Sequence, residues 1–241
     1  MSELTPDEAF LTLYTDLARE GPGAPADLGW ALSVAATPEQ ARIADAGCGS
    51  GADTVVLAKE RPRAQIEAVD KVAHFVEAAR RRVAPFGSRV WVRQGDMADL
   101  HGPYDLIWCA GALYFLGVTE GLRLWRKALA PGGAVAFSEP CLLPRPSAAA
   151  RAFWAEYPQI TDVAGIRARV AEAGYRVLGE QMQIGDAWEA YYIPMARRIE
   201  TLRPGSTGAL AAALDEAERE IARWKAAPSE IAYALMVVAP A

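Results

Sequence analysis

The 241-residue sequence contains few of the residues that bind metals or form covalent cross-links. Its three cysteines, Cys48, Cys109 and Cys141, are widely spaced and form no Cys-x-x-Cys pair, and its two histidines are His74 and His101. An odd number of scattered cysteines with so little histidine argues against a disulfide scaffold and against a zinc site. We expect both histidines to lie at the surface.

Positive charge and long apolar runs are also lacking. Acidic residues outnumber basic ones by 30 to 25, for a net charge of −5, whereas a dedicated nucleic-acid-binding protein usually has a basic face. No apolar run approaches the ~20 residues that a membrane-spanning helix needs. The first residues lack the basic and apolar regions of a signal peptide. We therefore expect a cytoplasmic protein without nucleic-acid or membrane partners, for which a homodimer stays open.

From about residue 42 the sequence alternates short apolar runs with amphipathic segments. We predict strands at 43–46, 65–70, 89–94, 104–110 and 134–139, and helices at 51–59, 72–83 and 119–130. Strands that alternate with helices form right-handed crossovers and a parallel sheet. The pattern therefore predicts a single α/β domain with helices on both faces of the sheet.

The segments that flank this pattern have a different character. Thr5-Pro6-Asp7-Glu8 has the form of a capping box, and we expect the helix it starts to end at the glycines and proline of 21–23. Downstream we predict a helix at 162–173, a strand at 175–184, a helix at 209–225 and a last strand at 231–238. The last two strands are expected to pair as an antiparallel hairpin at one edge of the sheet.

These boundaries divide the domain into a core and additions. We expect residues 1–30 to form an N-terminal helical cap. Residues 141–160 and 185–228 are expected to be insertions that cover a substrate, because they lie outside the alternating pattern.

The most informative segment is 43–51, Ile-Ala-Asp-Ala-Gly-Cys-Gly-Ser-Gly. A predicted strand leads into three alternating glycines, which permit a tight turn and a close approach of backbone to ligand. The next helix offers unpaired N–H groups to an anionic group. The loop also fits the dinucleotide fingerprint, and Asp70 at the end of the second strand can hold ribose hydroxyls in an NAD site or an S-adenosylmethionine (SAM) site. The loop alone leaves both readings open.

Three other features favour SAM. Asp45, two residues before the first glycine, suits the ammonium of a methionine moiety and would repel a pyrophosphate. Asp96 and Met97 follow the third predicted strand, where the carboxylate can accept from an adenine amino group and Met97 can line the ring. A Leu-Ala-Pro-Gly-Gly turn at 129–133 precedes the fifth strand.

Together with Tyr-Asp-Leu-Ile-Trp at 104–108, these motifs resemble those of the class I SAM-dependent methyltransferases, in the same order. The resemblance extends over 43–140 and is strongest to small-molecule methyltransferases of the ubiquinone-biosynthesis type and their uncharacterised bacterial relatives. It implies a Rossmann-like, seven-stranded sheet with strand 7 inserted antiparallel between strands 5 and 6. It also implies methyl transfer from SAM to a small molecule, with S-adenosylhomocysteine as the product.

The resemblance assigns cofactor contacts residue by residue. It implies that Asp45 meets the methionyl ammonium, that Asp70 binds the ribose with Lys71 beside it, and that Asp96 and Met97 hold the adenine. The other expected cofactor contacts are Tyr14 from the N-terminal helix, Gly47, Cys48 and Gly49 from the loop, and Cys109 and Ala110 at the end of the fourth strand.

The acceptor side has no comparable motif. A sulfonium donor carries its own activation, so transfer mainly needs alignment and exclusion of water, and a base only where the acceptor must lose a proton. Our catalytic candidates are Tyr114, Glu139, Trp188 and Tyr192. Glu139 could act as a base or hold a cationic substrate, and a solvated strand-end carboxylate is the equal alternative. An aromatic set, Trp154, Tyr157, Trp188, Tyr191 and Tyr192, suits a planar or cationic small substrate, with simple packing as the alternative for about half of it.

Three alternatives remain at this point. An NAD-type oxidoreductase and a non-catalytic SAM-binding regulatory module both fit part of the pattern. The three cysteines follow neighbouring predicted strands, so they could converge on a soft acceptor such as arsenite, although each also suits an apolar strand end. DNA amino methylation is disfavoured, because the sequence lacks an Asn-Pro-Pro-Tyr motif.

Overall fold

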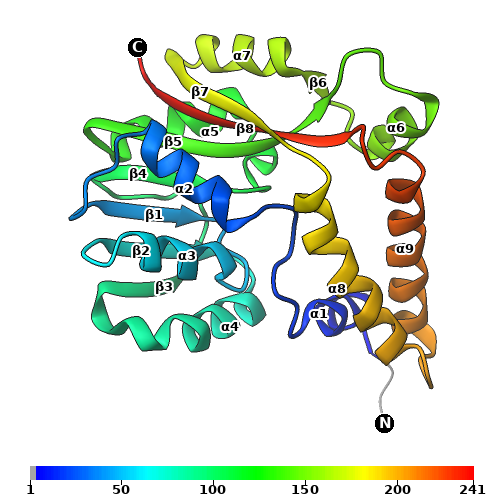
Figure 1. Ribbon diagram of the computed structural model, residues 1–241. Helices are drawn as coiled ribbons and strands as arrows, with labels where there is room; N and C mark the ends of the chain where they lie inside the picture. Colours follow the sequence, from blue (N-terminus) through cyan, green and yellow to red (C-terminus); the bar gives the residue numbers. More distant parts are fainter. Residues whose placement is uncertain (1–3) are drawn as a thin grey trace.

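A computed structural model describes residues 4–241, and its centre is one twisted sheet with helices on both faces (Figure 1). The parallel strands are β1 (Arg42–Ala46), β2 (Gln65–Asp70), β3 (Val90–Gln94), β4 (Tyr104–Cys109) and β5 (Leu129–Leu142). The last strand, β8 (Ile231–Pro240), runs antiparallel to both of its neighbours, β5 and β7 (Tyr175–Gln183). The resulting order is β3-β2-β1-β4-β5-β8-β7, and the two-residue strand β6 (Thr161–Asp162) pairs with β5.

This topology confirms the predicted fold class, including the antiparallel last strand between its two neighbours. Strand β6 raises the number of strands to eight. The βαβ units place the ends of the parallel strands at one edge of the sheet, where ligands bind in open α/β folds.

Each face of the sheet has its own apolar core, because successive side chains of a strand point to opposite faces. One face is covered by α2 (Pro25–Val34), α3 (Ala52–Glu60) and α4 (Ala73–Val83), whose buried residues pack with alternate residues of the strands. The other face is covered by α5 (Val118–Trp125) and α7 (Val163–Glu172). Short 3₁₀ turns, η1 (Ala84–Arg89), η2 (Leu113–Phe115), η3 (Arg126–Ala128) and η4 (Trp154–Glu156), complete the chain.

A third layer of helices lies beyond the end of the sheet at which β1–β4 finish (Figure 1). It consists of α1 (Pro6–Tyr14), α6 (Ala148–Phe153), α8 (Asp186–Leu202) and α9 (Gly208–Lys225). These helices share a third apolar cluster that is rich in tryptophan and tyrosine, including Trp154, Trp188, Tyr192 and Trp224. Segments far apart in the sequence therefore pack together next to the end of the sheet that carries the glycine loop.

The predicted start of α1 is confirmed, and its predicted end is wrong. Thr5 and Glu8 form the reciprocal capping box. The helix ends at Tyr14, well before the 21–23 break, because Asp16 adopts a left-handed φ of 65° and the Thr15 hydroxyl bonds the Leu11 carbonyl at 2.7 Å. The chain then crosses towards the sheet as an irregular segment.

Two helices were not predicted, and one predicted turn is part of a strand. Pro25 starts α2 at its first turn, and the Asp27 carboxylate accepts the Ala24 N–H at 2.8 Å. Helix α8 buries residues at helical spacing, from Trp188 to Ile199. Strand β5 already begins at Leu129, and the 129–133 turn appears as a register irregularity in its pairing with β4.

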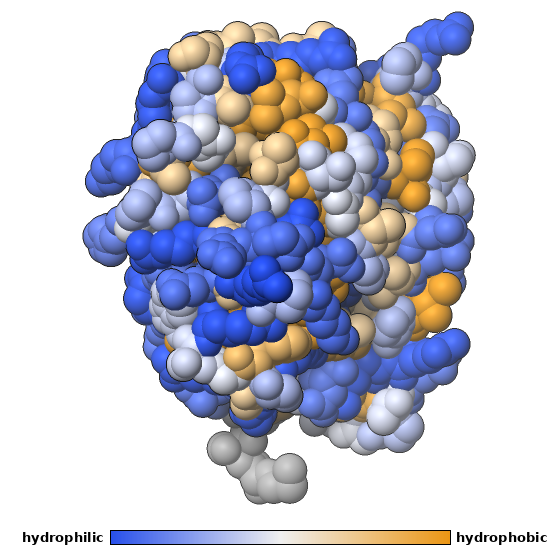
Figure 2. Space-filling view, turned by 60° about the vertical axis from the view of Figure 1, so that its left-hand side comes forward, coloured by the Kyte–Doolittle hydropathy of each residue, from blue (hydrophilic) through white to orange (hydrophobic). Residues whose placement is uncertain are grey.

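The side of the molecule on which the parallel strands begin is covered mainly by hydrophilic residues, with a group of apolar ones in its upper half (Figure 2). Among residues 4–241, no helix combines the length and the apolar character required to cross a membrane.

Candidate active site

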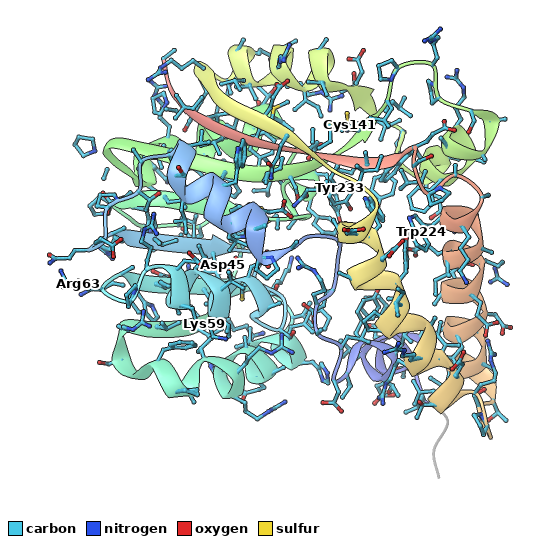
Figure 3. The ribbon with its side chains drawn as sticks, in the orientation of Figure 1. Asp45, Lys59, Arg63, Cys141, Trp224 and Tyr233 are labelled. Carbon is cyan, nitrogen blue, oxygen red and sulfur yellow. The ribbon has the colours of Figure 1, made fainter. Side chains whose placement is uncertain are left out.

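A cavity of about 690 Å³ lies between the carboxyl end of the sheet and the third layer of helices. Ten of the eleven predicted cofactor contacts line it: Tyr14, Asp45, Gly47, Cys48, Gly49, Asp70, Lys71, Asp96, Met97 and Ala110. Three of the four predicted catalytic residues also line it: Tyr114, Trp188 and Tyr192. Asp45 lies near the end of β1, Trp224 lies on α9, and Tyr233 lies near the start of β8 (Figure 3). The fold thus joins the two predicted groups of residues in one cavity.

The glycine loop owes its shape to backbone conformations that other residues rarely adopt. Gly47, Gly49 and Gly51 have φ values of 75°, 52° and 83°. A Cβ on Gly47 would lie 2.8 Å from the Cβ of Ala112, so there is no room for a side chain. The Gly47 N–H bonds the Val69 carbonyl at 2.8 Å, which holds the loop against the end of β2. The loop is therefore a cradle of backbone that a ligand can approach closely.

Asp70 braces this cradle from the neighbouring strand. Its two carboxylate oxygens accept the N–H groups of Gly49 and Val72, each at 2.8 Å. Each oxygen has a further lone pair, because a carboxylate offers about four acceptor positions. Asp70 can thus hold the loop and still accept from hydroxyl groups in the cavity.

Asp45 is a buried carboxyl that forms no salt bridge with a cationic side chain of residues 4–241. It is 2% exposed, and the Thr54 hydroxyl donates to it at 2.5 Å. Burial, together with the nearby Asp53 carboxylate, raises the pKa of Asp45 to about 8. An ammonium group at this end of the cavity would supply the missing positive charge. This site therefore fits the methionyl end of SAM.

The opposite edge of the cradle is formed by the segment after β3. Asp96 accepts the Ala98 N–H at 2.8 Å, and Trp125 Nε1 donates to the Met97 carbonyl at 2.7 Å. Both bonds fix the backbone on which Asp96 and Met97 reach the cavity. The two residues that are expected to hold the adenine are thus held in place at the cavity wall.

Two charged cavity residues between α1 and α2, Arg19 and Glu20, were not predicted from the sequence. Glu20 accepts the Ser50 N–H at 3.1 Å, and burial raises the pKa of its carboxyl. Arg19 donates to the Gly23 carbonyl at 2.6 Å and pairs with Asp53 at 3.4 Å. Neither residue belongs to a periodic pattern, and only the tertiary path of the chain brings them to the loop.

Aromatic residues enclose the rest of the cavity. Trp154 and Trp188 meet edge to face with ring centroids 5.9 Å apart, and Trp188 meets Tyr233 in the same way at 5.1 Å. The hydroxyl groups of Tyr14 and Tyr191 lie 2.7 Å apart. The predicted members Trp154, Tyr157, Trp188, Tyr191 and Tyr192 all line the cavity, and the sequence analysis missed Phe153 and Tyr233.

Two acidic residues that the sequence analysis did not single out also reach this aromatic end, Glu156 and Glu220. The Tyr192 hydroxyl donates to Glu220 Oε1 at 2.7 Å, and burial raises the pKa of the Glu220 carboxyl. Glu220 lies beside the buried stripe of α9, three residues after Ala217 and four before Trp224, but an acidic side chain at the edge of an amphipathic helix gives no signal of a cavity in the sequence.

Cys109 and Glu139, both predicted site residues, lie outside the cavity lining. The Cys109 side chain is buried in the core beneath α5 and α7, and Glu139 lies at the end of β5 and is 6% exposed. Burial raises the pKa of Glu139 to about 7. Their roles in the site stay predictions.

The cysteines and histidines do not form a metal site. Within the described part of the chain, no group of three or more His, Cys, Asp or Glu side chains is placed to hold a metal ion. Cys48 packs on one face of the sheet, Cys109 and Cys141 pack on the other, and burial raises the pKa of all three thiols. His101 is exposed as predicted, whereas His74 is half-buried, with Nε2 lying 3.1 Å from the Thr15 hydroxyl.

The strand order, the cradle and its flanking carboxylates define the class I SAM-dependent methyltransferase fold. A family model described as a methyltransferase domain matches residues 43–133. Residues 43–133 therefore match a methyltransferase domain within a chain that has the class I fold.

Similar proteins give a consistent picture. The chain is 32% identical to a trans-aconitate 2-methyltransferase of Paracidovorax citrulli over 170 residues, which cover 64% of this chain and 62% of that one. A SAM-dependent methyltransferase of Geobacter sulfurreducens, solved with S-adenosylhomocysteine, has a TM-score of 0.81 at 20% identity over the full length of both chains. The [4+2]-cyclase SpnF has a TM-score of 0.72 at 16% identity over 94% of this chain and 85% of that one.

These similarities have defined limits. The chain spans less than two thirds of the length of the first curated relatives that it matches. At 20% identity or below, the solved structures show the fold alone. Because a cyclase shares this fold, the activity must be argued from the site.

Proposed function

We propose that the protein transfers a methyl group from SAM to a small-molecule acceptor and releases S-adenosylhomocysteine. One observation carries this proposal: the glycine cradle, buried Asp45 and Asp70 line the same cavity as the aromatic residues. A cofactor held at the first end would present its sulfonium towards the second. That arrangement is what an in-line displacement requires.

In this proposal SAM supplies an activated methyl group, which the acceptor's lone pair takes while the electrons of the S–C bond pass to sulfur. Asp45 binds the ammonium of the methionyl end. Asp70, with Lys71 beside it, binds the ribose hydroxyls, and Asp96 and Met97 bind the adenine. An acceptor that carries a proton on its nucleophilic atom releases it to solvent or to a carboxylate, because the thioether product does not take it up.

Exclusion of water falls to the segments outside the core. Three such segments contribute to the cavity wall. Residues 141–160 do so through α6, residues 185–228 through α8 and α9, and the N-terminal cap through α1. Trp154, Trp188 and Tyr192 are each at most 2% exposed. We propose that these segments cover the acceptor during transfer, as the sequence predicts.

The topology argues against the alternative of an NAD-type oxidoreductase. Dinucleotide-binding folds have a wholly parallel order, 3-2-1-4-5-6, whereas β8 is antiparallel here. Asp45 adds a buried acidic group close to where a pyrophosphate would sit. A non-catalytic SAM-binding module keeps the same cradle, so only turnover separates it from an enzyme.

A screen for methyl transfer tests the proposal. The protein is incubated with SAM that carries a radiolabelled methyl group and with a fractionated metabolite extract. We expect label to enter a small-molecule fraction together with stoichiometric S-adenosylhomocysteine. SAM, but not NAD, should raise the melting temperature. A thermal shift with SAM and no transfer to any fraction would support the regulatory module, and a shift with NAD alone would support the oxidoreductase.

A further inference from the structure

Six aromatic side chains enclose the half of the cavity built by η2, η4, α8 and β8. We call this half the aromatic chamber, and its members are Tyr114, Trp154, Tyr157, Trp188, Tyr192 and Tyr233. Four of them, Trp154, Trp188, Tyr192 and Tyr233, are at most 5% exposed. Their positions are therefore set by packing on every side.

Four pairs of these rings meet almost at right angles, whereas Trp154–Tyr233 and Trp188–Tyr192 have interplanar angles of 30°. The interplanar angles are 73° for Trp154–Trp188, 78° for Trp188–Tyr233, 81° for Trp154–Tyr157 and 86° for Tyr114–Tyr157. Such a network presents ring faces in several directions. The rings surround a space on several sides and do not form two parallel faces. This arrangement favours a compact ligand group over a flat ring system.

Glu220 adds a carboxylate to this box. Its bond from the Tyr192 hydroxyl, at 2.7 Å, comes from a neutral phenol. Arg223, one turn further along α9, also reaches the cavity, but it is paired with Glu216 at 3.0 Å and lies 3.8 Å from Glu156. No salt bridge joins Glu220 to a cationic side chain in residues 4–241.

Acidic side chains outnumber basic ones around the whole cavity. Seven acidic side chains line it, Glu20, Asp45, Asp53, Asp70, Asp96, Glu156 and Glu220, and three basic ones, Arg19, Lys71 and Arg223. Arg19 is paired with Asp53. A polycarboxylate such as trans-aconitate, which the names of several relatives would suggest as the acceptor, would meet few available cations here.

A ring face carries negative potential and attracts a cation, and the attraction grows where water is excluded. We infer that the aromatic chamber binds an ammonium group of the methyl acceptor, with Glu220 as its counter-ion. This inference rests on the proposed function and narrows it to acceptors that carry a positively charged nitrogen. The ammonium is the recognition group, and the methyl-accepting atom lies wherever the rest of the molecule reaches the sulfonium.

Matched probes test the inference on the full-length protein saturated with S-adenosylhomocysteine. Calorimetry measures the binding of tetramethylammonium, choline and benzyltrimethylammonium, each against its uncharged isostere with a quaternary carbon in place of nitrogen, and of citrate as the anionic probe. We expect at least one cation to bind at least 10-fold more tightly than its isostere, and citrate to bind more weakly than that cation.

Two substitutions on α9 distinguish an effect on cation binding in the aromatic chamber from an effect on folding. Glu220→Gln keeps an oxygen that accepts from Tyr192 and removes the charge, so it should weaken cation binding at least 10-fold and leave S-adenosylhomocysteine affinity unchanged. Glu218→Gln removes an exposed charge from the same helix and should change neither affinity.

The outcomes separate this inference from the proposed function. If S-adenosylhomocysteine binds but cations and isosteres bind equally, or citrate binds best, or no probe binds at millimolar concentration, the chamber does not recognise ammonium. If Glu220→Gln retains full cation affinity, Glu220 is not the counter-ion. If S-adenosylhomocysteine itself fails to bind the wild-type protein, the proposed function fails first.

Discussion

The replacement Asp45→Asn removes the charge on which the methionyl end of the site depends. The side chain is 2% exposed, and its described polar contact is the bond that the Thr54 hydroxyl donates at 2.5 Å. The oxygen of asparagine can accept the same bond, so the substitution changes charge more than shape. We expect it to weaken the binding of S-adenosylhomocysteine and to remove the dependence of that binding on pH.

The pKa of about 8 gives the magnitude. At pH 7 about 0.9 of the Asp45 carboxyls are protonated in the ligand-free protein. An ammonium ligand favours the ionised form, so binding at pH 7 should release about 0.9 proton, and affinity should rise about 10-fold per pH unit below 8 and level off above it.

The same group makes the ligand-free protein less stable as the pH rises. Its folded-state pKa lies above the usual 3.8, so the contribution to stability is complete below pH 4 and is lost as the pH rises to 8. At about 1.4 kcal/mol per unit, the loss between pH 4 and pH 7 is about 4 kcal/mol at most, because relaxation around buried charges reduces it. In Asp45→Asn the free energy of unfolding should not show this decrease with rising pH.

Calorimetric titration with S-adenosylhomocysteine in buffers of different ionisation enthalpy counts the protons directly. The wild-type protein should release close to one proton per ligand at pH 7, and Asp45→Asn should release none from this position. Equal proton release by both proteins, or none by either, would show that Asp45 is not the partner of the ammonium.

Three further substitutions test other parts of the account. Gly47→Ala places a Cβ 2.8 Å from that of Ala112 at a φ of 75°; it should cost more than 1 kcal/mol of stability and lower SAM affinity at least 10-fold, and normal affinity by calorimetry would refute the cradle. Relative to wild type, the free energy of unfolding of Glu139→Gln should rise by up to about 3 kcal/mol between pH 4.5 and pH 7, because burial raises the pKa of Glu139 to about 7. The same difference in free energy of unfolding between the two proteins at both ends of this range would contradict it. Trp125→Phe removes the 2.7 Å hydrogen bond to the Met97 carbonyl. Loss of this bond should lower the free energy of unfolding by about 1 kcal/mol and weaken SAM binding several-fold. Lower stability with unchanged SAM affinity would limit Trp125 to a structural role.

The cofactor half of the site could be predicted because its signals are local. Asp45 and the glycines, Asp70, and Asp96 with Met97 each follow a strand directly, and the ends of parallel strands meet at one edge of the sheet. Their meeting at one edge could therefore be predicted from the strand ends and the handedness of the crossovers, while their roles towards SAM are what the family resemblance implies. The structure places Asp45, Gly47, Gly49, Asp70, Asp96 and Met97 on one cavity.

The acceptor half could be predicted only in part, because its walls come from segments that meet through tertiary packing. Tyr233 belongs to the last strand and Glu220 to α9, and their sequence surroundings indicate only a buried strand and an amphipathic helix. The buried residues of α8 from Trp188 to Ile199 do recur at helical spacing, so that helix had a signal. Glu139 is the opposite case. Its position near a strand end predicted that it would line the cavity, but its side chain lies on a face of the sheet outside the cavity lining.

The central claim is that the glycine cradle and Asp70 bind SAM. Calorimetric titration of SAM into the wild-type protein and into Asp70→Ala tests it most directly, with melting temperatures recorded to confirm that the variant folds. We predict saturable 1:1 binding to the wild type and its loss in Asp70→Ala, since the carboxylate both braces Gly49 and lines the cavity. Unchanged affinity in a folded Asp70→Ala protein would contradict the assignment of the whole site.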